Sequence, residues 1–158
     1  MSIVNTLSLE SNRQIKINFD GGDLSSDAGL LLIKEFVSKL GIDNLLGKVF
    51  KTNDSALFRY HTDQKNLLQM IYMIIAGYFE DDTSDELTND PVFKSVLEKD
   101  TLASQPTLSR FFNRMDEDTL IQFDDIYKNL RDIIYSIKRP EYVLFDLDST
   151  LFGTYGRQ

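Results

Sequence analysis

Cysteine is absent from this sequence and histidine occurs once, as His61, which limits the chemistry open to the chain. Without cysteine there are no disulfides and no thiolate metal sites, and one histidine leaves little for a histidine-based zinc site or a Ser-His-Asp triad. Any metal site must therefore depend on carboxylates. Carboxylate oxygens are ligands that suit Mg²⁺ or Mn²⁺.

Long hydrophobic runs are also missing. Residues 1–14 show no basic region followed by an apolar core, so we expect no signal peptide. The longest apolar stretch, residues 67–79, contains Gln69 and is too short to span a bilayer. The sequence therefore predicts a cytoplasmic protein with no membrane partner.

Basic residues are fewer than acidic ones, 17 against 25, so the formal net charge is −8. This balance argues against a uniformly basic nucleic-acid binder. Residues 80–100 contain eight acidic residues and two lysines, so one segment carries most of the negative charge. The rest of the chain is close to neutral.

Helical patterns make up most of what is present. At 158 residues, with 42% hydrophobic residues, the chain can form one domain with a core, or one domain and a fragment of a second. The runs 3–9 and 13–19 read as a β-hairpin. Capping and periodicity signals predict helices at 25 or 26 to 41, 42–50, 63 or 64 to 79, from Pro91, from Ser104, and at 116–137.

Arg139-Pro140 breaks the last of these helices, and the apolar run YVLFDL (142–147) is expected as a strand. We therefore expect a mainly α fold with a small β component. Residues 1–138 would form a hairpin plus a helical region, and residues 139–158 would begin a second domain.

The stretch YVLFDLDST carries the most suggestive chemistry. On an extended backbone, Asp146 and Asp148 point to the same side, which permits shared Mg²⁺ ligation. The alternative from the residues alone is a strand that ends in an Asx or Ser/Thr turn.

The stretch also resembles the opening hhhFDxDxT motif of haloacid-dehalogenase-like phosphatases. In that family Asp146 would be the phosphoryl-accepting nucleophile and Asp148 the general acid, and a lysine and a further acidic pair would have to follow.

A second resemblance covers nearly the whole chain. Four blocks occur in the order and approximate spacing of DDE transposases of the insertion sequence 1380 type: FDGGDLSSDAGLLLIKEF, AGYFEDDTSDELTNDPVFK, LASQPTLSRFFNR and VLFDLDST…YGRQ. The D-S-T triplet is similar to the D-[ST]-T of related cut-and-paste transposases. By this resemblance Asp148 is the first catalytic acid, and Asp146 is the runner-up or a supporting residue.

The resemblance implies DNA transposition. It makes 142–147 the first strand of a ribonuclease-H-like catalytic domain, in which Asp148 and Asp146 help to hold Mg²⁺ or Mn²⁺ for DNA cleavage and strand transfer. It also implies transposon-end DNA as the partner and a homodimer in the full-length protein. The second Asp and the Glu of such a site would lie beyond residue 158, so we expect a leading segment that is inactive alone. The alternative is a non-catalytic DNA-end-binding or dimerisation module.

The block SQPTLSRFFNR is the candidate for DNA contact. A capped short helix bearing Thr107, Ser109, Arg110 and Arg114 resembles the reader of a helix-turn-helix, with side chains that reach phosphates or guanines. The alternative is a core helix with exposed arginines, because Leu108, Phe111 and Phe112 form an apolar face.

The acidic stretch GYFEDDTSDELTNDP resembles a block of the same family but has Thr88 and Asn89 where that block is usually basic. We expect a structural or regulatory role here, with helix caps at Asp85 and Asp90; the alternative is a carboxylate metal site within 80–90. His61 has no partner signature, and we expect it to be structural.

Overall fold

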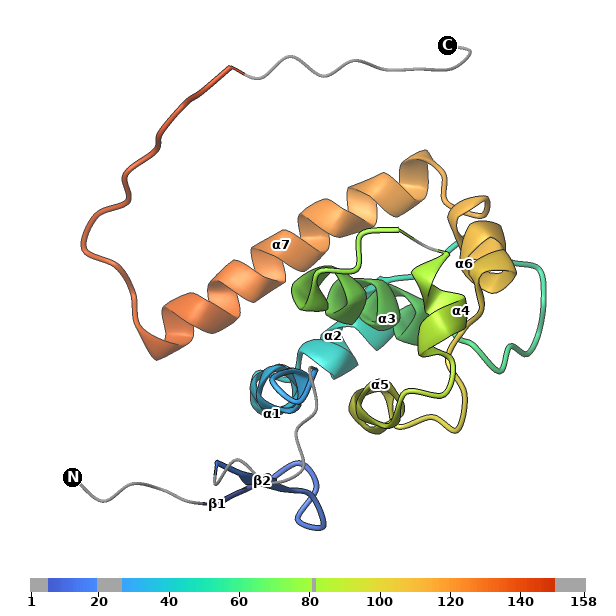
Figure 1. Ribbon diagram of the computed structural model, residues 1–158. Coiled ribbons are helices and arrows are strands. Elements are labelled where there is room, and N and C mark those ends of the chain that lie inside the picture. Colours follow the sequence, from blue (N-terminus) through green and yellow to red (C-terminus); the bar gives the residue numbers. More distant parts are fainter. Residues whose placement is uncertain (1–5, 20–26, 81, 150–158) are drawn as a thin grey trace.

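The computed structural model describes residues 6–19, 27–80 and 82–149. In these ranges the chain forms a small antiparallel sheet followed by helices, which confirms the expected mainly α fold with a small β component (Figure 1). The elements are β1 (Thr6–Ser8), β2 (Lys16–Asn18), α1 (Leu30–Lys39), α2 (Ile42–Val49), α3 (Asp63–Ala76), α4 (Thr83–Leu87), α5 (Pro91–Leu97), α6 (Gln105–Phe112) and α7 (Glu117–Ile137). None of the helices within the described ranges combines the length and the hydropathy that a bilayer span requires.

The strands β1 and β2 form the predicted hairpin, with Leu7 opposite Ile17. The hairpin is fastened to α1 through Glu35. The Glu35 carboxylate accepts hydrogen bonds from the Ser11 hydroxyl at 2.6 Å, from Ser11 N at 3.0 Å and from Glu10 N at 3.2 Å. These bonds, the one from the Ser11 side chain above all, lower the pKa of Glu35 and keep it ionised.

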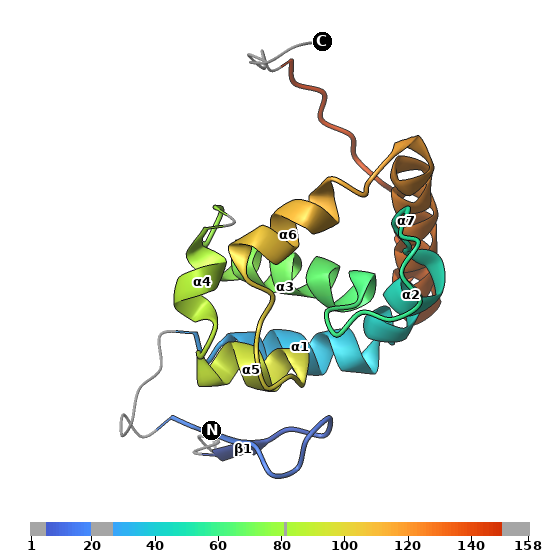
Figure 2. The ribbon, with the colours of Figure 1, turned by 90° about the vertical axis from the view of Figure 1, so that its right-hand side faces the viewer.

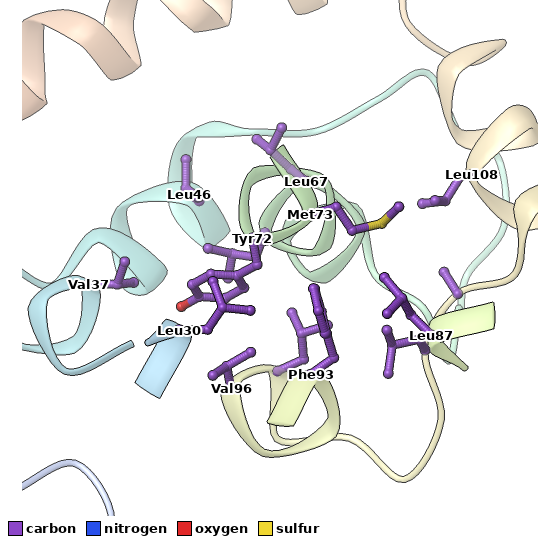
Figure 3. Packing of buried hydrophobic residues seen from close by; sticks show 14 of the residues in the cluster. Leu30, Val37, Leu46, Leu67, Tyr72, Met73, Leu87, Phe93, Val96 and Leu108 are labelled. Carbon is purple, nitrogen blue, oxygen red and sulfur yellow. The ribbon is translucent and has the colours of Figure 1, made fainter. Parts of the chain in front are cut away.

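Helix α3 lies at the centre of the helical body, where it contacts α1, α2, α5 and α6 (Figure 2). Its Tyr72 and Met73 are completely buried, as expected for a central helix. The burial does not extend around the whole helix, however, because Ile74 and Ile75 are about half exposed. Figure 3 shows the core around α3, which also includes Leu30, Val37, Leu46, Leu67, Leu87, Phe93, Val96 and Leu108.

Helix α3 begins where predicted and ends earlier. The Thr62 hydroxyl caps its start by accepting a hydrogen bond from Lys65 N. Gly77 follows the last helical residue with φ 93°, a left-handed conformation that only glycine adopts at little cost. The helix therefore stops at Ala76, and the expected continuation to Phe79 is wrong.

Helices α1 and α2 meet at another left-handed glycine. Gly41, with φ 66°, follows the end of α1 and precedes the first residue of α2, so the predicted stop is confirmed. The predicted start of α1, at Ser25 or Ser26, lies outside the described residues. In the described part of the chain the helix begins at Leu30.

Two further helix starts follow their sequence signals. Asp90 accepts a hydrogen bond from Phe93 N at 2.8 Å, and Pro91 occupies the first turn of α5. At α7, Asp116 accepts from Thr119 N at 3.0 Å while the Thr119 hydroxyl accepts from Asp116 N. The cap predicted at Asp90 and the helix predicted from residue 116 to residue 137 are both confirmed.

The acidic segment contains a short helix, α4, which starts at Thr83 and so earlier than a cap at Asp85 would place it. Asp85 lies inside α4 and does not cap it, because Asp82 is the residue that precedes its first turn. Asp85 instead accepts a hydrogen bond from Gln105 N at 2.9 Å, which satisfies a free N–H at the start of α6. The predicted cap at Asp85 is therefore wrong for α4, and Asp85 contacts the start of α6.

Helix α7 ends at Ile137 ahead of Arg139-Pro140, but the strand expected at 142–147 is not formed. Residues 138–149 lie outside any strand or helix and run away from both the helical body and the hairpin (Figures 1 and 2). Strand formation needs a hydrogen-bonded neighbour, and none of the described residues lies beside this segment as a strand. Phe145 and Leu147 are consequently 86% and 94% exposed.

Candidate nucleic-acid interface

Helix α6 has one buried face and one polar face. Leu108 and Phe111 are fully buried against the core, whereas Phe112, expected on the same apolar face, is 41% exposed. On the polar side, Thr107 and Arg110 lie one turn apart, and the Arg110 guanidinium donates to the Thr107 hydroxyl at 3.3 Å. The predicted apolar face is therefore confirmed for Leu108 and Phe111 but not for Phe112.

The start of α6 is held in place by two contacts from other parts of the chain. Gln69 of α3 makes a two-point contact with the backbone of Ala103, accepting from its N–H and donating to its C=O, both at 2.8 Å. Both residues are almost completely buried. Asp85 then accepts from Gln105 N. These contacts fix the position and direction of α6 relative to the core.

Arg114, just after α6, is turned inward and ties this helix to the 51–63 loop. Its guanidinium pairs with Asp63 at 3.0 Å and Asp54 at 3.4 Å, donates to the Thr52 hydroxyl at 3.1 Å and donates to the backbone carbonyl of Arg110 at 3.2 Å. Its side chain is only 17% exposed. The structure therefore shows Arg114 in a supporting position behind Arg110.

Asp54 holds a second arginine from the same loop. Arg59 donates to both carboxylate oxygens of Asp54, at 2.7 and 2.9 Å, in a bidentate pair. Hydrogen bonds from the Arg59 side chain and from Ala56 N, with the charges of Arg59 and Arg114, hold the pKa of Asp54 well below its usual range. Asp54 is therefore an ionised anchor shared by two arginines.

A pocket of about 210 Å³ opens between this loop and α6. Its lining is Arg59, Tyr60, His61, Asn66, Thr107, Arg110 and Arg114. Thr107, Arg110 and Arg114 are thus brought together, while Ser109 is not among the lining residues. Within the part of the chain that the structure describes, Arg110 forms no ion pair with a carboxylate, so it is the uncompensated cation of the pocket.

His61 belongs to this pocket, which its sequence context did not indicate. The Lys99 ammonium lies 3.2 Å from His61 Nδ1 and 4.2 Å from the centre of the Tyr60 ring. Burial, and then the charge of Lys99, lower the pKa of His61, so the ring is neutral near pH 7. Because Lys99 donates to Nδ1, the ring proton is assigned to Nε2.

Sequence reasoning missed Arg59 and Tyr60 as pocket residues and Lys99 as the cation that contacts Tyr60 and His61. Each comes from a segment separated from α6 along the chain, and only the packing of the 51–63 loop brings them together. The one local signal was the cluster RYH at 59–61, in which a cation and two aromatic rings are adjacent.

Asp146 and Asp148 lie in the exposed segment after α7, which Figure 1 shows running away from the helical body, and neither lines this pocket. Their carboxylate oxygens are the right donors for Mg²⁺ or Mn²⁺, but two exposed acids on an unpaired segment do not form a metal site. Across 6–19, 27–80 and 82–149, no group of three or more His, Asp or Glu side chains is placed to hold a metal ion. The same finding covers the described part of the acidic segment 80–90, where a carboxylate site was the alternative.

Comparison with known proteins relates the chain to a family. No curated protein and no solved structure matches the chain. The family model of the transposase DDE domain, group 1, matches residues 7–158, which include the hairpin, the helical body and the DLDST segment. The chain therefore belongs to the transposase DDE domain group 1 family.

Proposed function

We propose that this chain is the N-terminal, DNA-end-binding part of a cut-and-paste transposase of the insertion sequence 1380 type. The observation that supports this is the family match, which joins the helical body and the DLDST segment in one pattern from residue 7 to residue 158. The polar side of α6, with Thr107, Ser109 and Arg110, is the proposed contact with transposon-end DNA. Arg114 supports this contact by holding the backbone of Arg110.

In this proposal residues 1–138 bind DNA ends and form the dimer interface, and residues 139–158 lead into a ribonuclease-H-like catalytic domain. Asp148 is the proposed first catalytic acid and Asp146 the supporting one. Mg²⁺ or Mn²⁺ in such a domain would stabilise charge on the transferred phosphate. The described residues do not assemble that site, so we assign no catalytic step to them. We expect the isolated chain to bind DNA without cutting it.

A phosphatase of the haloacid-dehalogenase-like class would use the same DLD motif. That alternative gives no role to residues 7–138, which fall in the same family pattern as the motif. A lone dimerisation module is favoured by exposed apolar residues, which lie both on α7 and in the 138–149 segment. DNA-end binding accounts for more of the chain and is therefore preferred.

The salt dependence of DNA binding tests the proposal. The probe is a duplex carrying one of the inverted repeats that flank the coding region, compared with a scrambled duplex of equal length. Arg110→Ala should weaken binding and lower the slope of log K against log salt by about 0.9, the value for one phosphate contact. Lys128→Ala is the control, because Lys128 is an exposed cation of α7 paired with Asp125.

The control should leave both affinity and slope unchanged. A wild-type chain that does not distinguish the repeat from the scrambled duplex, or an unchanged slope in Arg110→Ala, would contradict the proposed role of α6. Arg114→Ala is expected to lower stability as well as binding, because it removes the half-buried partner of Asp63 and one of the two arginines that hold Asp54.

A further inference from the structure

The loop from Asp54 to His61 carries an exposed apolar tip next to the pocket. Leu57 is fully exposed and Phe58 is 81% exposed. The Asp54–Arg59 pair closes the loop at its base, and Ala56 N donates to Asp54 at 2.9 Å, so the tip is presented on a held turn. In Figure 1 the loop projects from the body on the same side as α6.

The pocket beside this tip has a small positive charge. Three guanidinium groups, those of Arg59, Arg110 and Arg114, face two carboxylates, those of Asp54 and Asp63. Among the lining residues one positive charge is left over, and it lies on Arg110; the Lys99 ammonium, 3.2 Å from His61 Nδ1, adds a second positive charge just outside the lining. A phosphodiester carries a single negative charge and accepts hydrogen bonds only, so it matches both the charge of Arg110 and donors such as the Thr107 hydroxyl and His61 Nε2.

We propose that the Asp54–His61 loop is a second DNA contact, which seats one backbone phosphodiester in the pocket and inserts Leu57 and Phe58 between bases beside it. Apolar side chains that enter an opened base step are used by proteins that kink or unstack DNA. A phosphate in the pocket would lie next to the tip. The phosphate contact and the insertion of Leu57 and Phe58 would therefore both involve one nucleotide step. The preferred ligand is DNA with a mismatched or unpaired step.

This proposal rests on the proposed DNA-binding function. It commits to DNA and not to a protein partner because the apolar tip is two side chains wide and adjoins the uncompensated Arg110. A protein interface of ordinary size would need a broader apolar surface around the tip. Of the neighbouring residues, Ser55, Arg59 and His61 are polar, Ala56 is small, and the half-exposed Tyr60 ring has the Lys99 ammonium 4.2 Å from its centre.

The apolar contact is tested with Phe58→Ala and Leu57→Ala in the full chain. The probes are the inverted-repeat duplex and the same duplex with a central mismatch that contains 2-aminopurine. Phe58→Ala should bind the mismatched duplex about 5- to 150-fold more weakly, as expected for the loss of one base–aromatic stacking contact. Leu57→Ala should also weaken binding, because it removes an apolar side chain from the opened base step. The salt slope should not change, because no charge is removed. Phe79→Ala, which removes an equally exposed phenylalanine beyond α3, is the matched control.

The readouts separate this proposal from the proposed function. In the wild type, 2-aminopurine fluorescence should rise on binding as the base unstacks, and Phe58→Ala should abolish the rise while Arg110→Ala reduces the salt slope. If DNA binding depends on Arg110 but both tip variants bind and unstack like the wild type, the loop contact is wrong and the proposed function stands. Tip variants that lose self-association in sedimentation but keep DNA binding would identify a protein contact and also overturn it. If the wild type binds no DNA, both proposals fall.

Discussion

Replacing Gln69 with Leu should destabilise the protein by about 2 to 5 kcal/mol, because it leaves two buried backbone groups without partners. Gln69 is 1% exposed and its amide satisfies both the N–H and the C=O of Ala103, which is fully buried. Leucine has a similar volume, so little cavity is created. Each buried polar group left unsatisfied costs about 1 to 3 kcal/mol, and a small gain from the added apolar surface offsets part of the sum.

The chain offers a matched control for this substitution. Gln122 of α7 makes the same two-point contact with the backbone of Lys51, at 2.7 and 3.0 Å, but at the surface. Water can replace the lost partner there, so Gln122→Leu should cost no more than about 1.5 kcal/mol. The difference between the two variants therefore measures the effect of burial at constant hydrogen-bond geometry.

Urea denaturation followed by circular dichroism gives both free energies of unfolding. A third variant, Gln69→Glu, gives an independent check through pH. A buried carboxyl has a raised pKa, and its protonated form can both donate and accept, so this variant should be most stable at low pH and lose stability as pH rises. Equal costs for Gln69→Leu and Gln122→Leu, or a Gln69→Glu variant that gains stability with rising pH, would refute the reasoning.

Three further outcomes are expected. The lowered pKa of Glu35 means that its contribution to hairpin docking is present above its ordinary value of 4.5 and lost as pH falls through the lower folded value. The protection factor of Ser11 N, in which the intrinsic pH dependence of amide exchange is divided out, should therefore fall in acid in the wild type and not in Glu35→Gln. Asp90→Ala should lower the free energy of unfolding by about 1 kcal/mol, with Asp90→Ser nearly neutral in the same urea titration. Phe145→Lys combined with Leu147→Lys should reduce self-association in sedimentation without changing helical circular dichroism, since both side chains are exposed on an unpaired segment.

Helix starts were predictable because their signals are local. Asp90-Pro91 and Asp116 lie within three residues of the N–H groups that they cap, so the sequence itself contains the interaction. The end of α3 was less predictable, since the apolar residues Tyr78 and Phe79 continue the helical pattern past Gly77. There the backbone conformation of one glycine outweighed periodicity.

The pocket was predictable only in part. Thr107 and Arg110 share a helix, and their spacing placed them on one side. The inward direction of Arg114 depends on Asp54 and Asp63, which are more than fifty residues earlier in the chain, and no sequence pattern links them. The strand expected at 142–147 shows the same limit, because an apolar run forms a strand only beside a pairing partner.

Helix α7 links the two proposed functional regions. It begins in the turn after α6 and ends on the far side of the body, where the 138–149 segment leaves it (Figure 1). At 1.5 Å per residue its 21 residues span about 31 Å, which is about the rise of nine base pairs of B-DNA at 3.4 Å each. Under the proposed function α7 therefore sets a fixed distance between the DNA contact on α6 and the start of the 138–149 segment, and the rest of the way to Asp146 and Asp148 is irregular chain.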